Sequence, residues 1–144
     1  NDAGGKRIIK AIEELRLKNI PNVFIHESLG RYNYHGMLNV CGRNGVCVGN
    51  SSSGIKETPF FGVPTVNIGS RQNSRLRSTN VIDTGYNKEK IKTAIENCLS
   101  DKAFRNGCSN CDNPYGVGNA GEKITGVLAE VPTGKKLLQK KMTY

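Results

Sequence analysis

The decapeptide Val48-Gly49-Asn50-Ser51-Ser52-Ser53-Gly54-Ile55-Lys56-Glu57 joins a predicted strand to a predicted helix. The apolar run at residues 46–48 is short, rich in β-branched side chains and flanked by glycines, which is typical of a buried strand. After four small polar residues and a glycine, residues 55–61 are expected to form a helix. The serines can cap that helix and leave its first amide groups pointing outward.

A strand, a loop of small residues and a helix start, in this order, predict an anion-binding site. Amides without an intrahelical partner and the positive end of the helix dipole attract phosphate. The hydroxyls of Ser51, Ser52 and Ser53, next to Gly54, add donors that do not crowd an approaching oxyanion. The same residues also fit a serine-rich turn that only caps a helix, because Ser and Gly are ordinary turn residues.

The length and composition fit one domain. The chain has 144 residues, of which 36% are apolar, enough to support a core. We expect a single domain over residues 1–144, with a basic tail or helix at 132–144. No stretch approaches the roughly 18 consecutive apolar residues of a membrane span, and the first residues lack the apolar core of a signal peptide. The expectation is a soluble, cytoplasmic protein with no membrane partner.

The five cysteines do not predict a disulfide framework. Their number is odd, and Cys41 and Cys47 lie in or near segments expected to be buried, so reduced thiols are the simpler interpretation. Cys108 and Cys111 have the spacing of half a zinc site or of a redox motif. Because a second such pair is missing and neither histidine is near in sequence, we expect no metal site.

The net charge of +9 indicates an anionic partner: nucleic acid, a membrane surface or a phosphorylated small molecule. Lysines crowd the last ten residues, as is usual for a solvated face. Three other basic residues closely follow a predicted strand, where they are positioned to contact a ligand. They are Arg71, Arg75 and Arg77. The absence of Trp and the low number of other aromatic residues argue against nucleic acid, since bases are commonly bound by stacking.

Hydrophobic periodicity predicts strands that alternate with helices. Helices are expected at residues 4–17, 34–41, 55–61, 87–99 with Asn87 as cap, 122–128 and in the basic tail. Strands are expected at 23–26, 46–48, 64–68 and 81–83, and residues 101–121 as a polar loop. This order predicts an α/β fold with a parallel sheet. The loops that follow His26, Val48 and Ile68 then lie at the carboxyl edge of the strands, where such sheets bind ligands.

The serine-rich stretch belongs to a longer motif. Residues 48–57, continuing through 61–72 and 75–77, closely resemble the hydrolysing UDP-N-acetylglucosamine 2-epimerases of sialic acid precursor synthesis. Residues 1–5 are similar to that family's Asn-x-Asp-Ala-Gly turn, and residues 113–120 to its late glycine-rich loop. The resemblance implies a glycosyltransferase B type fold, in which two Rossmann-like halves enclose a nucleotide sugar. This chain resembles only the C-terminal half.

The resemblance implies that residues 48–57 bind the diphosphate and the ribose. Ser51 and Ser52 would bind the diphosphate together with the helix amides. Glu57, one turn into the helix, would accept hydrogen bonds from the ribose hydroxyls, for which a carboxylate is well suited. Glu57 also fits a first-turn acid that only favours the helix dipole.

Other positions are implied around the nucleotide. Tyr34 would lie near the uracil, or would be a core residue of its own short helix. The backbone around Leu29 to Arg31 would read the edge of the base. Arg71 would approach the phosphates or the partner domain. Further candidates are Asn1 and Asp2 on the sugar side, Arg75, Arg77, Gly116 and Gly118.

Two departures from the family pattern limit what this chain can do. Val117 stands between Gly116 and Gly118, where the family has an aspartate, so the loop loses an acceptor. The family's catalytic acids lie in its N-terminal half, and its histidine lies upstream of this chain. Neither His26 nor His35 matches that histidine, and we expect no catalytic residue here.

The implied reaction is elimination of UDP from UDP-N-acetylglucosamine, followed by hydration to N-acetylmannosamine, with no cofactor. This half would hold the UDP, as part of an enzyme with a missing N-terminal half. One alternative is a free-standing module that binds UDP or a UDP-N-acetylhexosamine without turnover. Another is a basic scaffold for nucleic acid. The identity of the sugar and a homo-oligomeric state stay open.

Overall fold

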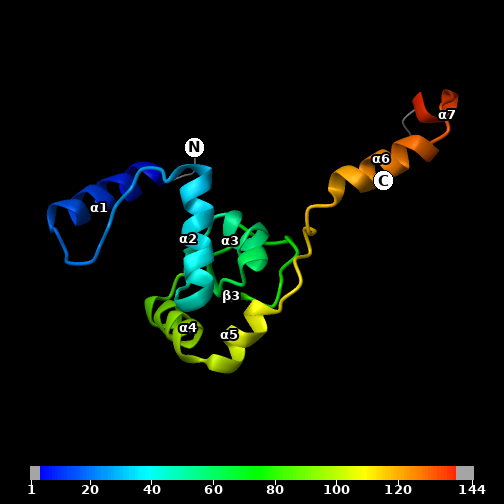
Figure 1. Ribbon diagram of the computed structural model, residues 1–144. Coiled ribbons are helices and arrows are strands. Elements are labelled where there is room, and N and C mark those ends of the chain that lie inside the picture. Colours follow the sequence, from blue (N-terminus) through cyan, green and yellow to red (C-terminus); the bar gives the residue numbers. More distant parts are fainter. Residues whose placement is uncertain (1–3, 139–144) are drawn as a thin grey trace. The chain divides into compact units, whose positions relative to one another are not determined.

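The computed structural model describes residues 4–138. The expected turn with Asn1 and Asp2 and the end of the basic tail lie outside the described residues. The chain divides into two compact units, Asn1–Gly36 and Met37–Tyr144, and each is described by itself. The helix α2 begins in the first unit and ends in the second (Figure 1).

The first unit contains the helix α1 (Gly5–Leu17), which confirms the helix expected there. None of the described residues 4–36 is buried. The expected strand at residues 23–26 is wrong: these residues form no ladder, and Phe24 is 82% exposed. An apolar run becomes a strand only where a neighbouring strand accepts its backbone hydrogen bonds, and the described residues offer it none.

The helix α2 (Gly30–Asn44) is longer than the helix expected at residues 34–41. It takes in Gly30 and Arg31, which the sequence had suggested were loop. The amide of Gly30 donates to Ser28 Oγ at 3.1 Å, so a serine hydroxyl satisfies one of the first amides of α2. Ser28 is the signal for this earlier start.

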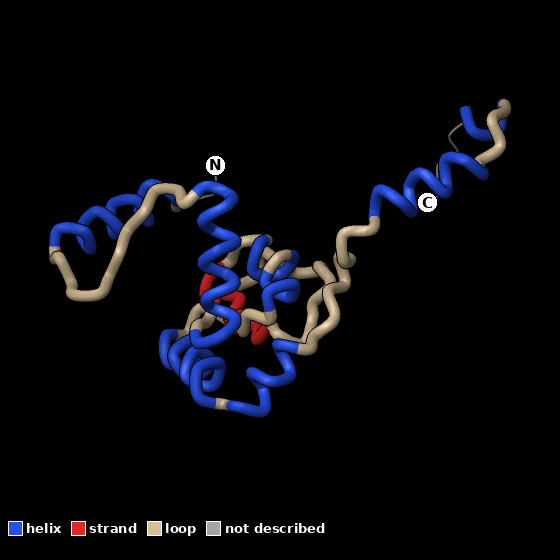
Figure 2. The backbone as a smooth tube through the Cα atoms, in the orientation of Figure 1, coloured by secondary structure: helices blue, strands red, loops and turns tan. Residues whose placement is uncertain are grey.

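The second unit is built on a parallel sheet of three strands in the order β1-β2-β3. Figure 2 draws the strands in red among the helices of this unit. The strands are β1 (Cys47–Gly49), β2 (Thr65–Ile68) and β3 (Val81–Thr84). Cys47 pairs with Thr65, and Thr65 pairs with Val81. The expected α/β class with a Rossmann-like parallel sheet is confirmed. The expectation that the first of these strands is buried is wrong, because β1 is an edge strand in this sheet and Val48 is 42% exposed.

Alternation along the central strand β2 directs side chains to two faces of the sheet. Val66 packs against Ala94 and Cys98 of the helix α4 (Lys88–Ser100). Thr65, one residue earlier, instead donates to Thr58 Oγ1 beside the helix α3 (Ser53–Lys56). The sheet is therefore covered by α4 on one face and by α3 and the segment after it on the other.

The helix expected at residues 55–61 is broken into α3 and the short 3-10 helix η1 (Thr58–Phe61). Pro59 explains the break, because proline has no N–H and disfavours α conformation at the residue before it. The cap at Asn87 is confirmed, since its Oδ1 accepts from the amide of Lys90 at 3.0 Å.

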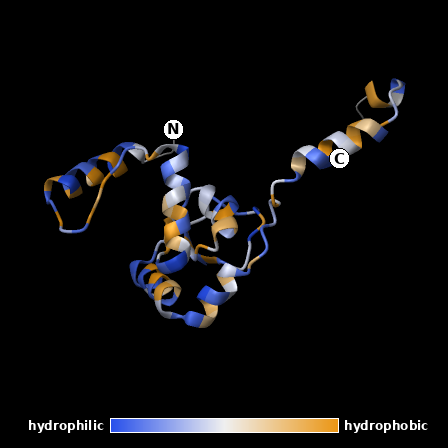
Figure 3. Ribbon diagram, viewed as in Figure 1, coloured by the Kyte–Doolittle hydropathy of each residue, from blue (hydrophilic) through white to orange (hydrophobic). Residues whose placement is uncertain are grey.

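The loop expected at residues 101–121 is wrong in its first half, which forms the helix α5 (Lys102–Ser109). Asp101 caps it through a bond from the amide of Phe104 to Oδ1 at 2.9 Å. The helices α6 (Ala120–Glu130) and α7 (Lys135–Leu138) follow. Apolar residues recur along both α1 and α6 (Figure 3), and neither helix has a buried residue.

Candidate functional site

The serine loop, residues 50–54, follows β1 at the carboxyl edge of the sheet. Ser51 organises it: its Oγ accepts from the amide of Ser53 at 3.3 Å, and its carbonyl accepts from the amide of Gly54 at 3.2 Å. The sequence predicted that the first amides of the helix point outward, but α3 begins at Ser53 and its first two amides are bonded to Ser51. Ser52 occupies the N-cap position but makes no side-chain capping bond. Its hydroxyl is not used to cap α3.

Position 54 favours glycine because the loop lies close against the sheet. A Cβ atom there would come within 3.2 Å of Thr65 Cγ2. Below the loop, buried Thr58 donates to the carbonyl of Gly54 at 2.8 Å and accepts from Asn80 Nδ2 at 3.1 Å. This network fixes the start of α3 on β2. Glu57, half-buried, follows directly after α3.

The arginine loop, residues 69–80, follows β2 at the same edge. Near its start lies buried Gln72, which is 3% exposed and donates from Nε2 to the carbonyl of Asn50 at 2.7 Å. This bond ties the arginine loop to the serine loop across 22 residues of sequence. Arg71 and Arg75 have exposed side chains.

Arg77 differs from the other two arginines. Its Nε lies 2.6 Å from Asp83 Oδ2, and Nη1 donates to the carbonyl of Arg75 at 2.7 Å. The other oxygen of Asp83 accepts from Asn67 Nδ2 at 2.6 Å. Arg77 thus links the arginine loop to β2 and β3, and a phosphate would have to compete with Asp83 for its guanidinium.

The late glycine-rich loop, residues 113–120, contacts the end of α3 and the arginine loop. Asn113 Nδ2 donates to the carbonyl of Lys56 at the end of α3, at 3.1 Å. Tyr115 donates its hydroxyl to the carbonyl of Leu76 at 3.1 Å, and Lys56 Nζ lies 5.6 Å from the centre of its ring. The glycine-rich loop is therefore bonded to the arginine loop and to the end of the helix that follows the serine loop. Gly116 and Gly118 both have positive φ, at 97° and 96°, which favours glycine.

The residues implied for the uracil lie in the first unit. Leu29 and Tyr34 are half-buried and Arg31 is exposed. Together with the neighbouring residues 26–30 they line a shallow hollow of about 440 Å³. The structure thus brings Leu29, Arg31 and Tyr34 together around one hollow within that unit.

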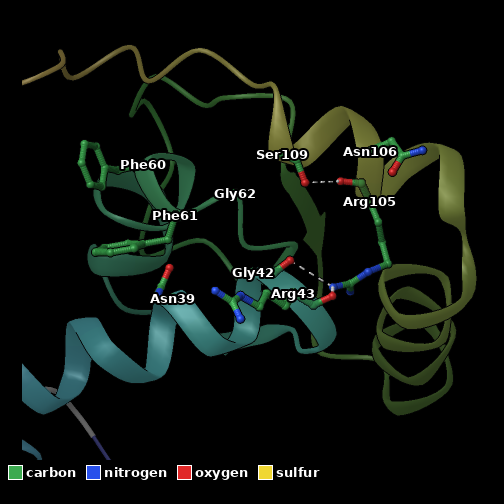
Figure 4. A pocket seen from close by; sticks show the side chains of 9 residues that line it. All are labelled: Asn39, Gly42, Arg43, Phe60, Phe61, Gly62, Arg105, Asn106 and Ser109. Atoms are coloured by element: carbon green, nitrogen blue, oxygen red, sulfur yellow. Dashed lines mark hydrogen bonds between the residues drawn. The ribbon is translucent and has the colours of Figure 1, made fainter.

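A cleft of about 510 Å³ lies elsewhere in the second unit, where α2 and η1 lead into β1 and β2 (Figure 4). It is therefore at the amino ends of the strands. Its main polar side chain, Arg105 of α5, donates from Nη1 to the carbonyls of Gly45 and Cys98 at 2.9 and 2.8 Å. From Nη2 it donates to the carbonyls of Gly42 and Arg43 at 3.2 and 2.7 Å. Arg105 joins the ends of α2 and α4, and its role is structural.

The sequence reasoning missed both Gln72 and Arg105. Arg105 was placed in a presumed loop, and the available signal was Asp101, a typical helix N-cap. Gln72 has no such local signal, because its partner is Asn50 on another loop.

Two of the thiols, those of Cys47 and Cys108, have a raised pKa. Burial, aided by the neighbouring Cys111 thiol, raises the pKa of Cys108 to about 11. Burial and the Cys41 thiol likewise raise the pKa of Cys47 to about 11. A raised pKa is the opposite of what a reactive thiolate requires. Within residues 4–138, no three His, Cys, Asp or Glu side chains are grouped as a metal site would need.

The three-stranded parallel sheet, with the serine and arginine loops joined at its carboxyl edge, defines an α/β protein with a Rossmann-like parallel sheet. The family described as UDP-N-acetylglucosamine 2-epimerase matches residues 1–129, and the chain belongs to this family. No helix among the described residues has the length and apolar character to cross a membrane.

Three curated relatives are similar to the chain over much of its length. It is 35% identical over all 144 residues to UDP-N,N'-diacetylbacillosamine 2-epimerase (hydrolyzing) of Legionella pneumophila, covering 36% of that protein. It is 36% identical over 104 residues (72% of the chain) to GDP/UDP-N,N'-diacetylbacillosamine 2-epimerase (hydrolyzing) of Campylobacter jejuni, covering 26% of that protein. It is 34% identical over 100 residues (69% of the chain) to UDP-N-acetylglucosamine 2-epimerase of Neisseria meningitidis, covering 25%. The chain thus spans about a quarter to a third of these relatives, which fits a resemblance to the C-terminal half only.

Proposed function

We propose that this chain is the nucleotide-binding part of a hydrolysing UDP-N-acetylhexosamine 2-epimerase and that it holds the UDP portion of the substrate. The observation that carries the proposal is the hydrogen bond that joins the arginine loop to the serine loop at the carboxyl edge of a parallel sheet. The glycine-rich loop is in turn bonded to the arginine loop and to the end of α3. Ligands of such sheets bind at this edge.

The diphosphate would lie on the serine loop. The hydroxyls of Ser51, Ser52 and Ser53 supply donors, and Gly54 keeps the loop backbone accessible and close to the sheet. A ligand would draw the amides of Ser53 and Gly54 from their bonds with Ser51, because charged acceptors form stronger hydrogen bonds than neutral ones.

Glu57 would accept the ribose hydroxyls, and Arg71 would balance the charge of the diphosphate. In the first unit, Tyr34 and the backbone from Leu29 to Arg31 would contact the uracil. Arg75 and the backbone at Gly116 and Gly118 are further candidates, and Arg77 would contribute only by leaving Asp83.

In chemical terms, this chain would stabilise the negative charge that develops on UDP as it leaves the sugar. Preorganised donors lower such a barrier without any proton transfer of their own. The proton-transfer groups would come from the part of the protein outside this chain. The relatives are named for two different sugars, so the proposal extends only to a UDP-N-acetylhexosamine. The cytoplasmic location and a homo-oligomeric state stay predictions.

Isothermal titration calorimetry of the chain with UDP tests the proposal. We expect saturable binding of one UDP per chain, and no turnover of UDP-N-acetylglucosamine by the chain alone. A short oligonucleotide of the same total charge serves as control for the net charge of +9. Binding of the oligonucleotide with no heat from millimolar UDP would reject the proposal and favour the nucleic-acid alternative.

A further inference from the structure

Gln72 is the most deeply buried polar side chain near the start of the arginine loop. It is 3% exposed, whereas its neighbours Arg71 and Asn73 are exposed. Its Nε2 donates to the carbonyl of Asn50, the first residue of the serine loop, at 2.7 Å. The two loops follow adjacent parallel strands, and this bond joins them directly.

The oxygen of the same amide does not contribute a hydrogen bond to the described part of the fold. Gln72 Oε1 is buried and has no hydrogen-bond partner within the described part of the chain. Leaving a buried acceptor unsatisfied lowers stability. An apolar side chain of similar length would fill the position without that penalty, so packing alone does not account for a glutamine.

We propose that Gln72 is a positioning residue that holds the serine loop in the conformation that binds the diphosphate. The carbonyl of Asn50 marks the point where the chain leaves β1, and the turn made by Ser51 begins one residue later. Fixing this carbonyl from the arginine loop limits how far the serine hydroxyls can move relative to β2. The inference rests on the proposed function for its consequence, which is tighter UDP binding.

The test compares Gln72→Met with Asn73→Met, a matched control that introduces the same side chain one residue further along. Asn73 is tied to the loop through its main chain, whose amide donates to the carbonyl of Ser70 at 3.0 Å. Replacing its exposed side chain leaves that bond in place. Methionine keeps the length and burial of Gln72 while removing both polar atoms.

The first readout is amide hydrogen exchange of the full chain without ligand. In Gln72→Met we expect the amides of residues 52–56 to exchange about 10-fold faster than in the unchanged chain, while those of α4 stay unchanged. The urea concentration at the midpoint of unfolding should stay the same or rise, because the variant no longer buries the unsatisfied oxygen Oε1 of Gln72. The control should exchange like the unchanged chain. Faster exchange throughout the second unit together with a lower midpoint would mean a merely structural role and would overturn the inference.

The second readout is calorimetric titration with UDP, where Gln72→Met should raise the dissociation constant about 10-fold. If the unchanged chain binds UDP and Gln72→Met binds it equally well, the positioning role is wrong and the proposed function stands. If the amides of Gln72→Met exchange faster as expected but the unchanged chain binds no UDP, then Gln72 does hold the serine loop and the proposed function is wrong. Gln72→Asn, which keeps the amide but is one methylene shorter, should show the same loosening and serves if the methionine variant does not fold.

Discussion

The two ends of the sheet in the second unit use polar side chains for different purposes. At the amino ends, Arg105 donates to four backbone carbonyls, although it borders a cleft of about 510 Å³. At the carboxyl ends, Gln72 makes one bond and leaves a buried oxygen without a partner among the described residues. The amino ends therefore carry a structural arginine bonded to four carbonyls, while an incompletely satisfied side chain lies at the loops.

This difference shows that the polar side chains at the two ends of the sheet are satisfied to different degrees. A guanidinium with four carbonyl acceptors has little capacity left for a ligand. Gln72 Oε1 is an acceptor and cannot bind an anion, so the contribution of Gln72 at the loops is the bond that it donates to Asn50. The comparison predicts that substitutions at the amino ends change stability alone and that those at the carboxyl ends change binding.

The largest effect is expected for Arg105→Ala. It leaves the ends of α2 and α4 without their shared donor and should lower the free energy of unfolding by about 2–4 kcal/mol, measured by urea denaturation. Arg105→Lys should restore little, because an ammonium group lacks the planar fork. Arg43→Ala, in the same cleft but with an exposed side chain, is the control and should stay within about 0.5 kcal/mol. A folded Arg105→Ala protein with weakened UDP binding would break the comparison.

An intermediate effect is expected for Glu57→Gln at the carboxyl ends. Loss of a charged acceptor for the ribose should weaken UDP about 10-fold, or about 1.4 kcal/mol, and should leave inorganic pyrophosphate binding nearly unchanged. Calorimetric titration of both ligands measures this. Equal losses for the two ligands would remove the ribose role from Glu57 and leave it a residue of the helix start.

The smallest effect concerns pH and Cys108, which lies in α5, the helix that also borders the cleft. Burial raises the pKa of this thiol from 9.0 to about 11 in the folded state. Its contribution to stability is therefore complete below pH 9 and is lost as the pH rises toward 11. Between pH 8 and 9.5, the free energy of unfolding should fall by up to about 1 kcal/mol more in the unchanged chain than in Cys108→Ala. Identical slopes for the two proteins, in the presence of a reductant, would contradict the expectation.

Local patterns predicted much of the second unit. The three strands, the α4 stripe and its Asn87 cap each depend on residues within a few positions of one another. The strand expected at residues 23–26 failed because an apolar run does not specify its pairing partner. The missed helix α5 had a local signal in Asp101, which the polar composition of the segment concealed.

By itself, the sequence determined the class of fold, the small-residue loop after β1 and the family, because periodicity, turn chemistry and motif spacing are all local. Only the tertiary structure decided how that loop is held. The bonds from Gln72 to Asn50, Asn113 to Lys56 and Tyr115 to Leu76 join residues 22, 57 and 39 positions apart. Such bonds depend on where parallel strands end in space, and no pattern within a single segment records that.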